Sequence, residues 1–432
     1  MFDAFIVSRL ARVALLGIAL ALFGCRGGAF RESDAEASGR PRALGEQAAC
    51  APRFPDQGGW LGGDSAASVV LPHGDGRASL WLFGDSFVAR PGAPAERSYP
   101  FAHNSIAVSH CDARGTWHLD YSFGGHPNEG RETGPRAFFE PDPEAAWVVQ
   151  ARRETDGEAY YWPISAAAIG DAVYVALLRV APGPASGPFR LPFQLLGVDL
   201  ARIDNTAAPP ETWRVRYATL ANRTDVLPAS SLVAVGEHLY AFAFLASGDG
   251  RSPRILTRLP IEALAAGHSD LEDAVETLAK GGQWIPGLQP SQARILMDDD
   301  ASEMSVHFDP GLHEWLAVYS DLSPDAKSPL TETLWLRRAQ RLTGPWSRPL
   351  PLGHVPELAS RPDPLPGELF CYAAKAHPEL ARSAELLVTY VCNIYGERDD
   401  ELPALLERLR TTPSIYRPQA LRLGVPPSPT PD

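Results

Sequence analysis

Short apolar runs separated by turn residues recur along the chain, and five stretches follow one plan. Each starts with small or polar residues, continues as an apolar strand, turns at a Gly, Asp, Pro or Ser cluster, and returns as a second apolar strand. These hairpins are predicted at residues 61–87, 161–180, 227–246, 301–321 and 372–393. A third strand-like piece follows each of them, at residues 104–111, 193–203, 254–261, 333–342 and 416–424.

Repeated antiparallel units of three or four strands predict an all-β fold, and five of them predict a five-bladed β-propeller with short helical insertions. In a propeller the first strand of every blade lines the central channel, so the starts of those strands converge at one end. The alternative built from the same hairpins is a β-sandwich. Five similar modules have no natural place among the strands of a sandwich, so the propeller is favoured.

Two segments have helical rather than strand spacing. Residues 269–280 open with a Ser cap and carry apolar positions three and four apart, and residues 399–410 precede the last strand. Both are predicted to be helical insertions. We also expect the N-terminal segment near Cys50 to close the last blade.

The composition agrees with a turn-rich β fold, since the 432 residues include 41 Pro and 37 Gly but only 3 Met. The formal net charge is −13, and no basic stripe with interleaved aromatic residues is present. The sequence therefore argues against nucleic-acid binding. A soluble, exported protein that acts on a neutral or cationic ligand fits this charge balance.

The first residues predict a targeting segment. Arg9 and Arg12 precede a short apolar run that ends just before Cys25, which is typical of a secretory signal rather than a membrane span. The stretch LFGC at 22–25 resembles a bacterial lipobox, which would make Cys25 the lipidated first residue of the mature protein; ordinary signal cleavage nearby is the alternative. We expect a signal peptide at 1–24, a flexible tether at 25–43, one propeller at 44–425 and a disordered tail at 426–432. The expected location is the bacterial cell envelope, at the outer membrane or cell surface, with membrane contact through the lipid anchor.

Four further cysteines, an even number, suggest disulfides in an exported protein: Cys50, Cys111, Cys371 and Cys392. Three pairings are possible. Cys371 and Cys392 lie about equally far from the turn at 381–384, so a hairpin would place them face to face. The preferred pairing is therefore 371–392 with 50–111. Metal ligation is the weaker interpretation, because no Cys-x-x-Cys or His-rich spacing is present.

Ionisable and aromatic side chains stand at or near the predicted inner-strand starts. The candidate catalytic carboxylates are Asp64 and Glu303, with Asp85 on the strand beside Asp64. Glycoside hydrolysis needs one carboxylic acid to protonate the leaving oxygen and one carboxylate to activate water or to attack. Trp offers a flat face for a sugar ring, while Lys and His hydrogen-bond hydroxyl groups and shift nearby carboxylate pKa values. The candidate substrate-binding residues are Trp162, Asn104, Lys375, His377 and Asn393.

The segments LWLFGDSF, NSIAV, SEMSVHFDP and KAHPEL resemble the five-bladed propellers of the furanosidase-like glycoside hydrolases. The first two are most similar to the domain of unknown function 4185 (DUF4185) group, some members of which are endo-acting arabinan hydrolases. The resemblance covers roughly residues 58–425. It implies that Asp64 is the general base or nucleophile, Glu303 the acid, and Asp85 a modulator of the pKa of Asp64.

The chain also departs from that pattern. Related propeller glycosidases usually carry an Asp at the start of blade two and an acid on blade three, where this chain has Ser165 and Ser230. Two functions therefore stay open. The first is a secreted or lipid-anchored glycoside hydrolase that acts on a polysaccharide, with a furanose-containing, arabinan-like polymer as one candidate. The second is a non-catalytic propeller at the cell surface that binds a glycan or a protein.

No cofactor is predicted. The acidic run Asp298–Asp300 offers oxygen ligands for a structural calcium ion but lacks the spaced ligand pattern of a calcium loop. The sequence contains no nucleotide-binding glycine loop, no serine-nucleophile elbow and no zinc helix motif. The expected partner is a polysaccharide or glycan, and the chain is expected to be a monomer.

Overall fold

The structure is a computed structural model that describes most of the chain from Cys50 to Pro427. The described residues are 50–73, 76, 78–89, 101–124, 136–155, 157–186, 191–246, 252–299, 301–321, 333–359, 368–382, 384–395 and 402–427. The predicted signal peptide, the lipidated Cys25, the tether and the last residues of the tail lie outside them.

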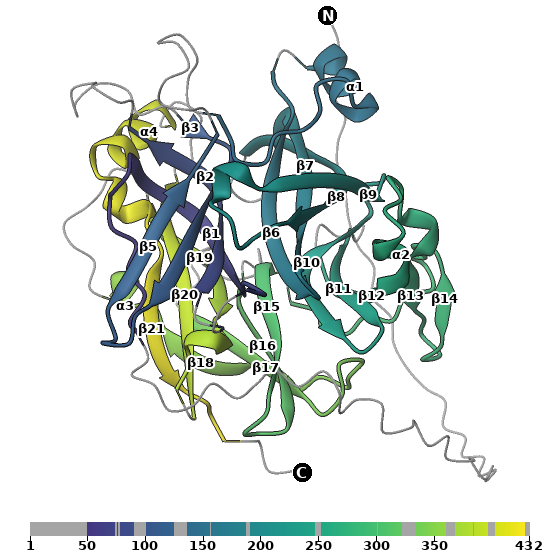
Figure 1. The fold of residues 1–432 in the computed structure, drawn as a ribbon. Helices are drawn as coiled ribbons and strands as arrows, with labels where there is room; N and C mark the ends of the chain where they lie inside the picture. The colour runs from purple at the N-terminus through teal and green to yellow at the C-terminus, as the bar shows by residue number, and fades with distance from the viewer. Residues whose placement is uncertain are drawn as a thin grey trace, which may run out of the picture. The chain divides into compact units, whose positions relative to one another are not determined.

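Five antiparallel sheets form a five-bladed β-propeller (Figure 1), so the predicted fold class is confirmed. Blades one and two consist of β1 Trp60–Val70, β2 Ala78–Val88, β3 Phe101–Ala102, β4 Ser105–Cys111, β5 Trp117–Ser122, β6 Tyr160–Ile169, β7 Ala172–Ser186, β8 Leu191–Asp204 and β9 Arg214–Ala221. Blades three to five consist of β10 Val226–Val235, β11 His238–Leu245, β12 Arg254–Pro260, β13 Glu276–Leu278, β14 Trp284–Pro286, β15 Ala301–Asp309, β16 Glu314–Asp321, β17 Thr333–Ala339, β18 Leu350–His354, β19 Glu368–Ala376, β20 Glu385–Tyr395 and β21 Gln419–Gly424.

Helices are few and short. The α-helices are α1 Ala146–Glu154, α2 Ile261–Ala265, α3 Pro356–Ala359 and α4 Leu402–Thr411, and the 3-10 helices include η3 Glu272–Ala274 and η6 Pro413–Tyr416. The predicted helix at 399–410 is confirmed over its described part by α4. The predicted helix at 269–280 is wrong, because only η3 is helical there. Residues 276–278 instead extend blade three as β13, in which Thr277 pairs with Thr257 of β12 and Glu276 binds Arg258.

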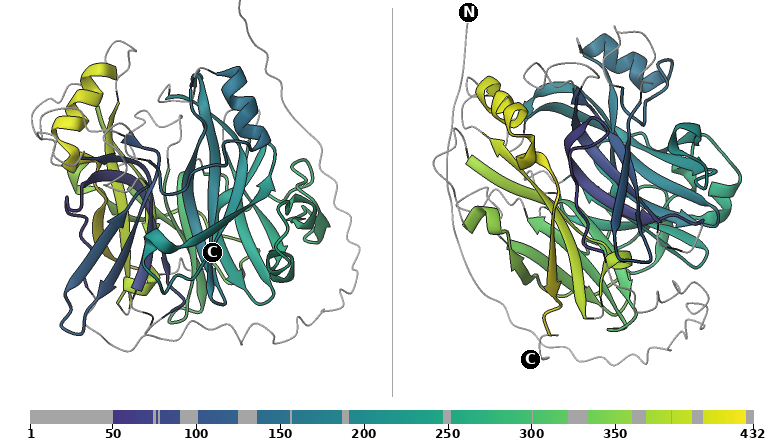
Figure 2. Two further views of the ribbon diagram at one scale, coloured as in Figure 1. Left: turned by 45° about the horizontal axis from the view of Figure 1, so that its top comes forward. Right: turned by 60° about the vertical axis from the view of Figure 1, so that its left-hand side comes forward.

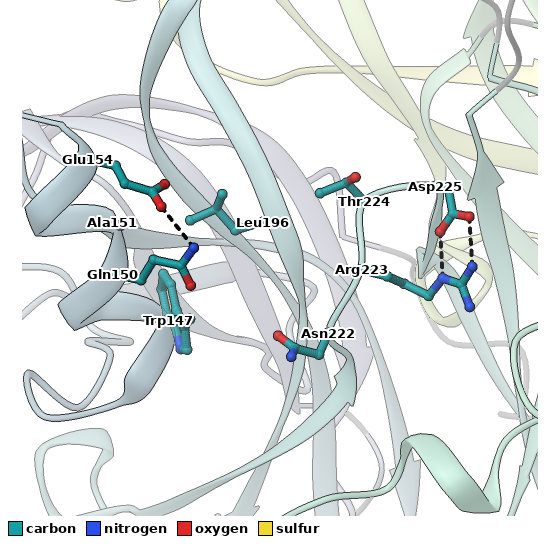
Figure 3. Close-up of a pocket in the computed structure, with 9 residues that line it drawn as sticks. All are labelled: Trp147, Gln150, Ala151, Glu154, Leu196, Asn222, Arg223, Thr224 and Asp225. Carbon is teal, nitrogen blue, oxygen red and sulfur yellow. Dashed lines mark hydrogen bonds and ion pairs between the residues drawn. The ribbon is translucent and has the colours of Figure 1, made fainter.

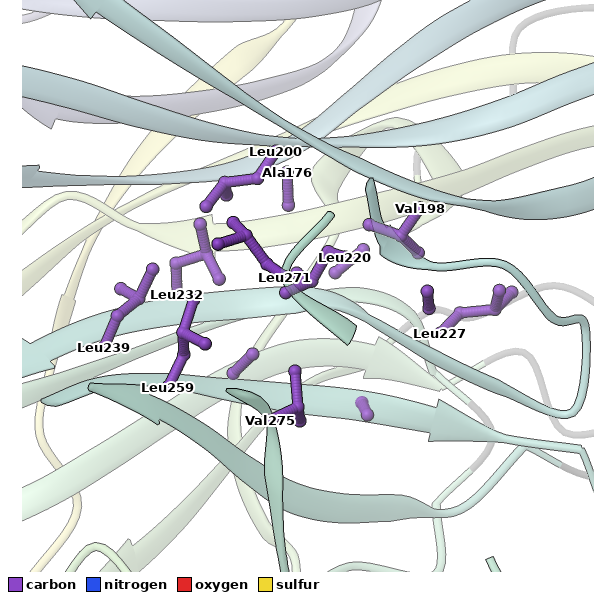
Figure 4. Close-up of a cluster of buried hydrophobic side chains, with 14 of the residues drawn as sticks. Ala176, Val198, Leu200, Leu220, Leu227, Leu232, Leu239, Leu259, Leu271 and Val275 are labelled. Atoms are coloured by element: carbon purple, nitrogen blue, oxygen red, sulfur yellow. The ribbon is translucent and has the colours of Figure 1, made fainter. Parts of the chain in front are cut away.

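The ring closes through apolar cores that each lie between two neighbouring blades. One cluster joins blades one and two, and others join two and three, three and four, four and five, and five and one. Figure 4 shows the cluster between blades two and three, where Leu200 and Leu220 face Leu232, Leu259 and Val275. Because each sheet buries both faces against its neighbours, the second strand of a blade reads as a nearly continuous apolar run.

A belt of polar contacts joins the inner strands β1, β6, β10, β15 and β19 around the centre. Each inner strand has a register irregularity along its pairing with the second strand of its blade, which locally breaks the alternation of side chains. Small hydroxyls beside these irregularities reach the next blade. The contacts are Ser65 Oγ to Pro163 O (3.5 Å), Ser165 Oγ to Ala229 O (2.7 Å), Val306 N to Ser231 Oγ (3.0 Å), Ala376 N to Ser305 Oγ (2.7 Å) and Lys375 Nζ to Ser65 O (2.9 Å).

Two disulfides have the predicted pairing, Cys50–Cys111 and Cys371–Cys392. The expectation that the segment near Cys50 closes the last blade is wrong for the described residues, where blade five contains only β19, β20 and β21. The segment instead lies against blade five through side chains, since Arg422 donates to Cys50 O at 3.0 Å and Arg417 binds Asp56 at 2.9 Å.

One end of the propeller carries extra structure. Figures 1 and 2 show α1 and α4 at the same end of the blades, where α1 leads into β6 and α4 leads through η6 to the last strand. The candidate carboxylates lie toward this end, near the start of β1 and of β15. Of the helices among the described residues, none is both long and apolar enough to cross a membrane.

Candidate active site

Asp64 is positioned by an irregular stretch of β1. The next two residues, Ser65 and Ala66, have φ values of 70° and 55°, in the left-handed region that non-glycine residues rarely adopt. The pairing with β2 shifts on both sides of Ser65. Backbone strain of this kind costs free energy and is concentrated at functional sites, so Asp64 is a functional candidate on geometry alone.

Gly84 on β2 leaves the space that the Asp64 carboxylate fills. A Cβ atom at this position would lie 2.4 Å from Asp64 Oδ1 and 3.9 Å from Trp162 Cδ1. The first distance is far shorter than any normal contact, and the carboxylate is held from its other side, so Asp64 would have to move. The glycine of the FGD motif is therefore required by the neighbouring carboxylate rather than by its own backbone.

Asp85, the last residue of that motif, is bound by two side chains. Trp162 Nε1 donates a hydrogen bond to Asp85 Oδ1 at 2.9 Å, and His103 Nδ1 is 3.2 Å from the same oxygen. The side chain of Asp85 is 20% exposed. Two donors therefore hold a carboxylate that still reaches solvent.

Two tyrosines from the last blade bind Asp64. The hydroxyl of Tyr372, on β19, donates to Asp64 Oδ2 at 2.7 Å, and Tyr416, at the end of η6, also hydrogen-bonds this carboxylate. Tyr416 is buried and its ring packs edge-on against Phe87. Asp64 is thus held between blades one and five.

Glu303 and Lys375 form a buried ion pair beside the irregular stretch of β1. Lys375 Nζ lies 3.1 Å from Glu303 Oε2, and the two side chains are 2% and 11% exposed. The same ammonium donates to Ser65 O at 2.9 Å. Burial lowers the pKa of Lys375, while the charges of Glu303 and Asp64 oppose that shift.

The carboxylates differ in their electrostatics. Burial raises the pKa of Asp64 to about 7, and the negative charges of Asp85 and Glu303 add to the shift, while the hydroxyls of Tyr372 and Tyr416 oppose it. Burial also raises the pKa of Asp85, but its neighbours His103 and Trp162 both favour the ionised form. Interacting groups of this kind titrate as a unit, and Asp64 is the member whose pKa is raised further by anionic neighbours.

An aromatic wall borders Asp85. The rings of His103 and Tyr160 are stacked with centroids 3.5 Å apart, and Trp162 contacts both Tyr160 and Phe193 edge-on, at 5.7 Å and 4.6 Å. All four side chains are partly exposed. Wide, rigid faces beside carboxylates suit the stacking of a sugar ring.

The structure does not bring all predicted residues together. Asn104 is fully buried, and its amide binds the backbone of Phe139 and Tyr161, so it fixes a loop to blade two. His377 is also fully buried, between Ser68 and Thr389. Burial lowers its pKa to about 3, with the charge of Lys375 adding to the shift. The side chain of Asn393 accepts a hydrogen bond from the neighbouring backbone amide of Ile394.

Asp298 and Asp299, considered for calcium, instead bind the guanidinium of Arg337 at 2.7 and 2.6 Å. The part of the chain that the structure describes contains no cluster of three or more His, Cys, Asp or Glu suited to a metal ion. Asp300 lies outside that part.

Sequence reasoning missed the two tyrosines and most of the aromatic wall: Tyr372, Tyr416, His103, Tyr160 and Phe193. Three of them lie next to motifs or predicted strand starts, so the sequence pattern could have indicated them. His103 precedes the NSIAV motif, Tyr160 begins an inner strand, and Tyr372 begins the last hairpin. Tyr416 lies on a 3-10 turn, and no sequence pattern places that turn beside Asp64.

A family profile described as "Domain of unknown function (DUF5005)" matches residues 53–424. The chain belongs to this family. The match covers the whole propeller of this DUF5005 protein. The expected resemblance to the DUF4185 group is not confirmed. No curated protein matches the chain.

One solved structure shows the same fold as the DUF5005 chain, and two others are less similar. A predicted hydrolase from Bacteroides ovatus has a TM-score of 0.58 and 16% identity, over 84% of this chain and 86% of that chain. An α-L-arabinanase from Cellvibrio cellulosa in complex with arabinohexaose has a TM-score of 0.41 and 10% identity, over 84% of this chain and 92% of that one. An α-L-arabinofuranosidase from Podospora anserina in complex with cellotriose has a TM-score of 0.41 and 11% identity, over 88% and 95%. At 16% identity the likeness to the Bacteroides ovatus structure shows the fold alone, and the other two are weaker.

Proposed function

We propose that the protein is a glycoside hydrolase that cleaves a polysaccharide at the Asp64–Asp85 site. The observation that carries this proposal is the contrast between two neighbouring carboxylates beside an aromatic wall. Asp64 has a pKa raised to about 7 by burial and anionic neighbours, while Asp85 accepts hydrogen bonds from Trp162 and His103. Pairs of carboxyl groups with such opposed environments are what glycoside hydrolysis requires.

In this proposal Asp64 is the general acid. A carboxylic acid that stays protonated near neutral pH can deliver its proton to the leaving glycosidic oxygen. As that oxygen departs, the hydroxyl groups of Tyr372 and Tyr416 stabilise the carboxylate that Asp64 becomes. This role differs from the one that the family resemblance implied, in which Asp64 was the base or nucleophile.

Asp85 is the proposed base or nucleophile. Its two donors oppose the effect of burial and favour its ionised form, and its partly exposed side chain is accessible to a substrate. Trp162 and His103 both contact the same oxygen, so the second oxygen is the one left to activate water or to attack the sugar carbon. Whether water or Asp85 attacks is decided by the anomeric form of the first product.

Glu303 has a supporting role rather than that of the acid. Its carboxylate is buried and its Oε2 lies 3.1 Å from Lys375 Nζ, so it binds an amine of the protein rather than reaching a substrate. Its negative charge instead raises the pKa of Asp64. Lys375, in turn, binds the backbone of Ser65 and so holds the irregular stretch of β1 that presents Asp64.

The proposed substrate is a neutral polysaccharide, with a furanose-containing polymer such as arabinan to be tried first. The experiment is release of reducing sugar from arabinan, levan, xylan and arabinoxylan by the purified chain. We expect cleavage of at least one polymer, with loss of cleavage in Asp64→Asn and Asp85→Asn. Binding of a polymer without cleavage of any would instead support the non-catalytic glycan-binding propeller, which the absent blade-two carboxylate favours.

We also infer export and lipid anchoring at Cys25. The two disulfides support an oxidising compartment, and the LFGC stretch supports lipidation. Labelling with a fatty-acid analogue in a bacterial host should modify the wild-type protein and not Cys25→Ser. Equal labelling of both proteins would contradict the inference.

A further inference from the structure

Helix α1 presents one face to a surface hollow that is separate from the carboxylates. Residues one helical turn apart line it from α1, and Leu196 of β8 and the segment 222–225 line it from the other side (Figure 3). The hollow has a volume of about 430 Å³, in the range of small-molecule sites. The residues from α1 are Trp147, Gln150, Ala151 and Glu154.

Two of the three charged side chains around the hollow, Arg223 and Asp225, bind each other. Arg223 forms two hydrogen bonds with Asp225, at 2.5 and 2.7 Å, and donates a third to Leu288 O. Glu154 accepts a hydrogen bond from Gln150 at 2.9 Å. An anionic ligand would meet the neutralised Arg223–Asp225 pair and the carboxylate of Glu154, so the lining disfavours an anion and is compatible with a neutral polar ligand.

Two amides supply fixed polar groups. Arg179 donates to Asn222 Oδ1 at 3.0 Å, and because a guanidinium can only donate, the oxygen and nitrogen of this amide are assigned. The amide nitrogen of Asn222 is therefore the group left to donate to a ligand. Gln150 is exposed on α1 and offers its carbonyl oxygen as an acceptor.

Trp147 supplies a rigid apolar surface. The guanidinium carbon of Arg179 lies 5.3 Å from the centre of the indole ring, and the ring of Tyr161 lies 5.4 Å away. Arg179 and Tyr161 are both bound to the buried carboxylate of Asp199. The indole is thus held in place before any ligand arrives, which lowers the entropic cost of stacking a sugar on it.

The hollow and the catalytic carboxylates lie on opposite sides of β6. Side chains alternate along a strand, and Tyr160 and Trp162 face His103 and Asp85, whereas Tyr161 between them faces Trp147. α1 runs directly into β6 at the end of the propeller where the carboxylates lie. Simultaneous binding at both places requires a polymer long enough to cross the start of β6.

We propose that this hollow is a second carbohydrate-binding site, which holds a segment of neutral polysaccharide against Trp147, Gln150 and Asn222 while another segment enters the catalytic site. The identity of the polymer rests on the proposed function. The site itself requires only that a neutral glycan binds here.

The test measures retardation in affinity gels that contain arabinan, levan, xylan or arabinoxylan, with the full chain carrying Asp85→Asn so that no polymer is cleaved. Adding Gln150→Ala with Asn222→Ala, or Trp147→Ala, should weaken binding of at least one polymer about 5-fold or more. Arg152→Ala, an exposed change on the other face of α1, is the matched control and should leave binding unchanged. Thermal melting checks that the variants fold. If Trp147→Ala does not fold, the double variant Gln150→Ala with Asn222→Ala alone tests the proposal.

In the catalytically intact background, the Gln150–Asn222 variant should raise KM about 5-fold for the long polymer and leave turnover of a two- or three-sugar substrate unchanged. Retardation that is equal in the variants and in the Arg152 control, or absent for every polymer, would overturn the proposal. If the wild-type protein cleaves a polymer but the hollow variants are retarded as strongly as the control, the second site is refuted and the hydrolase proposal stands. If the hollow variants lose retardation but the wild-type protein cleaves no polymer, the hydrolase proposal is refuted and the second site stands.

Discussion

The blade-one carboxylates and the Glu303–Lys375 pair lie on two sides of the same centre and differ in almost every physical respect. Asp85 is partly exposed and is bound by Trp162 and His103, while Glu303 is buried against the amine of Lys375. Asp64 lies between them and is influenced by both. The comparison teaches that residue type does not assign a role, since three carboxylates close together have three different environments.

The difference follows from how each residue is placed by the fold. Asp85 is on the second strand of blade one, close to the rim and to the aromatic wall, whereas Glu303 and Lys375 are on inner strands that close the polar belt. A carboxylate in the belt contributes to holding the blades together. A carboxylate at the rim is free to meet substrate.

The largest expected effect is on hydrolytic activity, which should depend far more on Asp64 and Asp85 than on Glu303. Asp85→Asn and Asp64→Asn should each lower kcat/KM about 10³-fold or more, because each removes a proton-transfer or attacking group. Glu303→Gln should lower it no more than about 30-fold, since it changes the charge near Asp64 and not the reacting groups. The measurement is steady-state hydrolysis of the preferred polymer. Retained activity in Asp85→Asn together with an inactive Glu303→Gln would reverse the assignment.

A smaller effect is expected from Gly84→Ala, which leaves every carboxylate in the sequence. The new methyl group would lie 2.4 Å from Asp64 Oδ1, so Asp64 should be displaced and kcat should fall about 100-fold. Gly424→Ala is the control, because nothing lies within 4 Å of a Cβ there, and its activity should stay within about twofold of wild type. Full activity in Gly84→Ala would show that the position of Asp64 is not critical.

Of the three carboxylates, His103→Ala should affect Asp85 most directly. Loss of the contact at 3.2 Å removes a group that favours the ionised carboxylate, so the pKa of Asp85 should rise. The acid limb of the kcat/KM profile should move to higher pH by about half a unit, with a few-fold loss at the optimum. His118→Ala, which removes a similar contact to Asp112 on blade one, should leave the profile unchanged. An unmoved acid limb in His103→Ala would mean that Asp85 does not set it.

The smallest effect concerns stability. The folded pKa of Asp64, about 7, is above its value of 3.8 in an unfolded chain, so the native state binds the extra proton and loses stability as pH rises from about 4 to about 7. At pH 8 the free energy of unfolding of Asp64→Asn should therefore be about 1–3 kcal/mol higher than that of wild type, and its melting temperature should be higher. At pH 4 the two proteins should differ little.

The control for that comparison has the opposite electrostatics. Asp204 is partly buried, yet its pKa is lowered because Arg202 and Arg216 bind it. Asp204→Asn should not gain stability at pH 8 in thermal melts. An equal gain in both variants would point to net charge rather than to the site.

Much of the fold could be predicted because its signal is periodic. Five hairpins with a third strand each define the blades, and the spacing of Cys371 and Cys392 about one turn defines a disulfide. The helix predicted at 269–280 was wrong because apolar spacing over a short segment fits a 3-10 turn followed by a strand equally well, and pairing with β12 decides between them.

The site could be predicted only in part. The position of Asp64 on an inner strand is evident in the repeat, but the left-handed residues Ser65 and Ala66 that present it are not. The contact of Tyr416 with Asp64 joins residues at opposite ends of the chain through a short turn, and hydrophobic periodicity carries no information about such a contact. Asn104 and His377 looked functional because they are polar, and their partners in the buried interior account for them.

The most direct test of the account is the alkaline limb of the pH dependence of kcat/KM, measured for wild type and Glu303→Gln on the same polymer. If Asp64 is the acid, wild-type activity should fall as pH rises through about 7, where Asp64 loses its proton. Removing the negative charge of Glu303 should lower the pKa of Asp64 and move that limb to lower pH by about one unit. A wild-type rate that holds or rises from pH 7 to 9, or a limb that does not move in Glu303→Gln, would contradict the account.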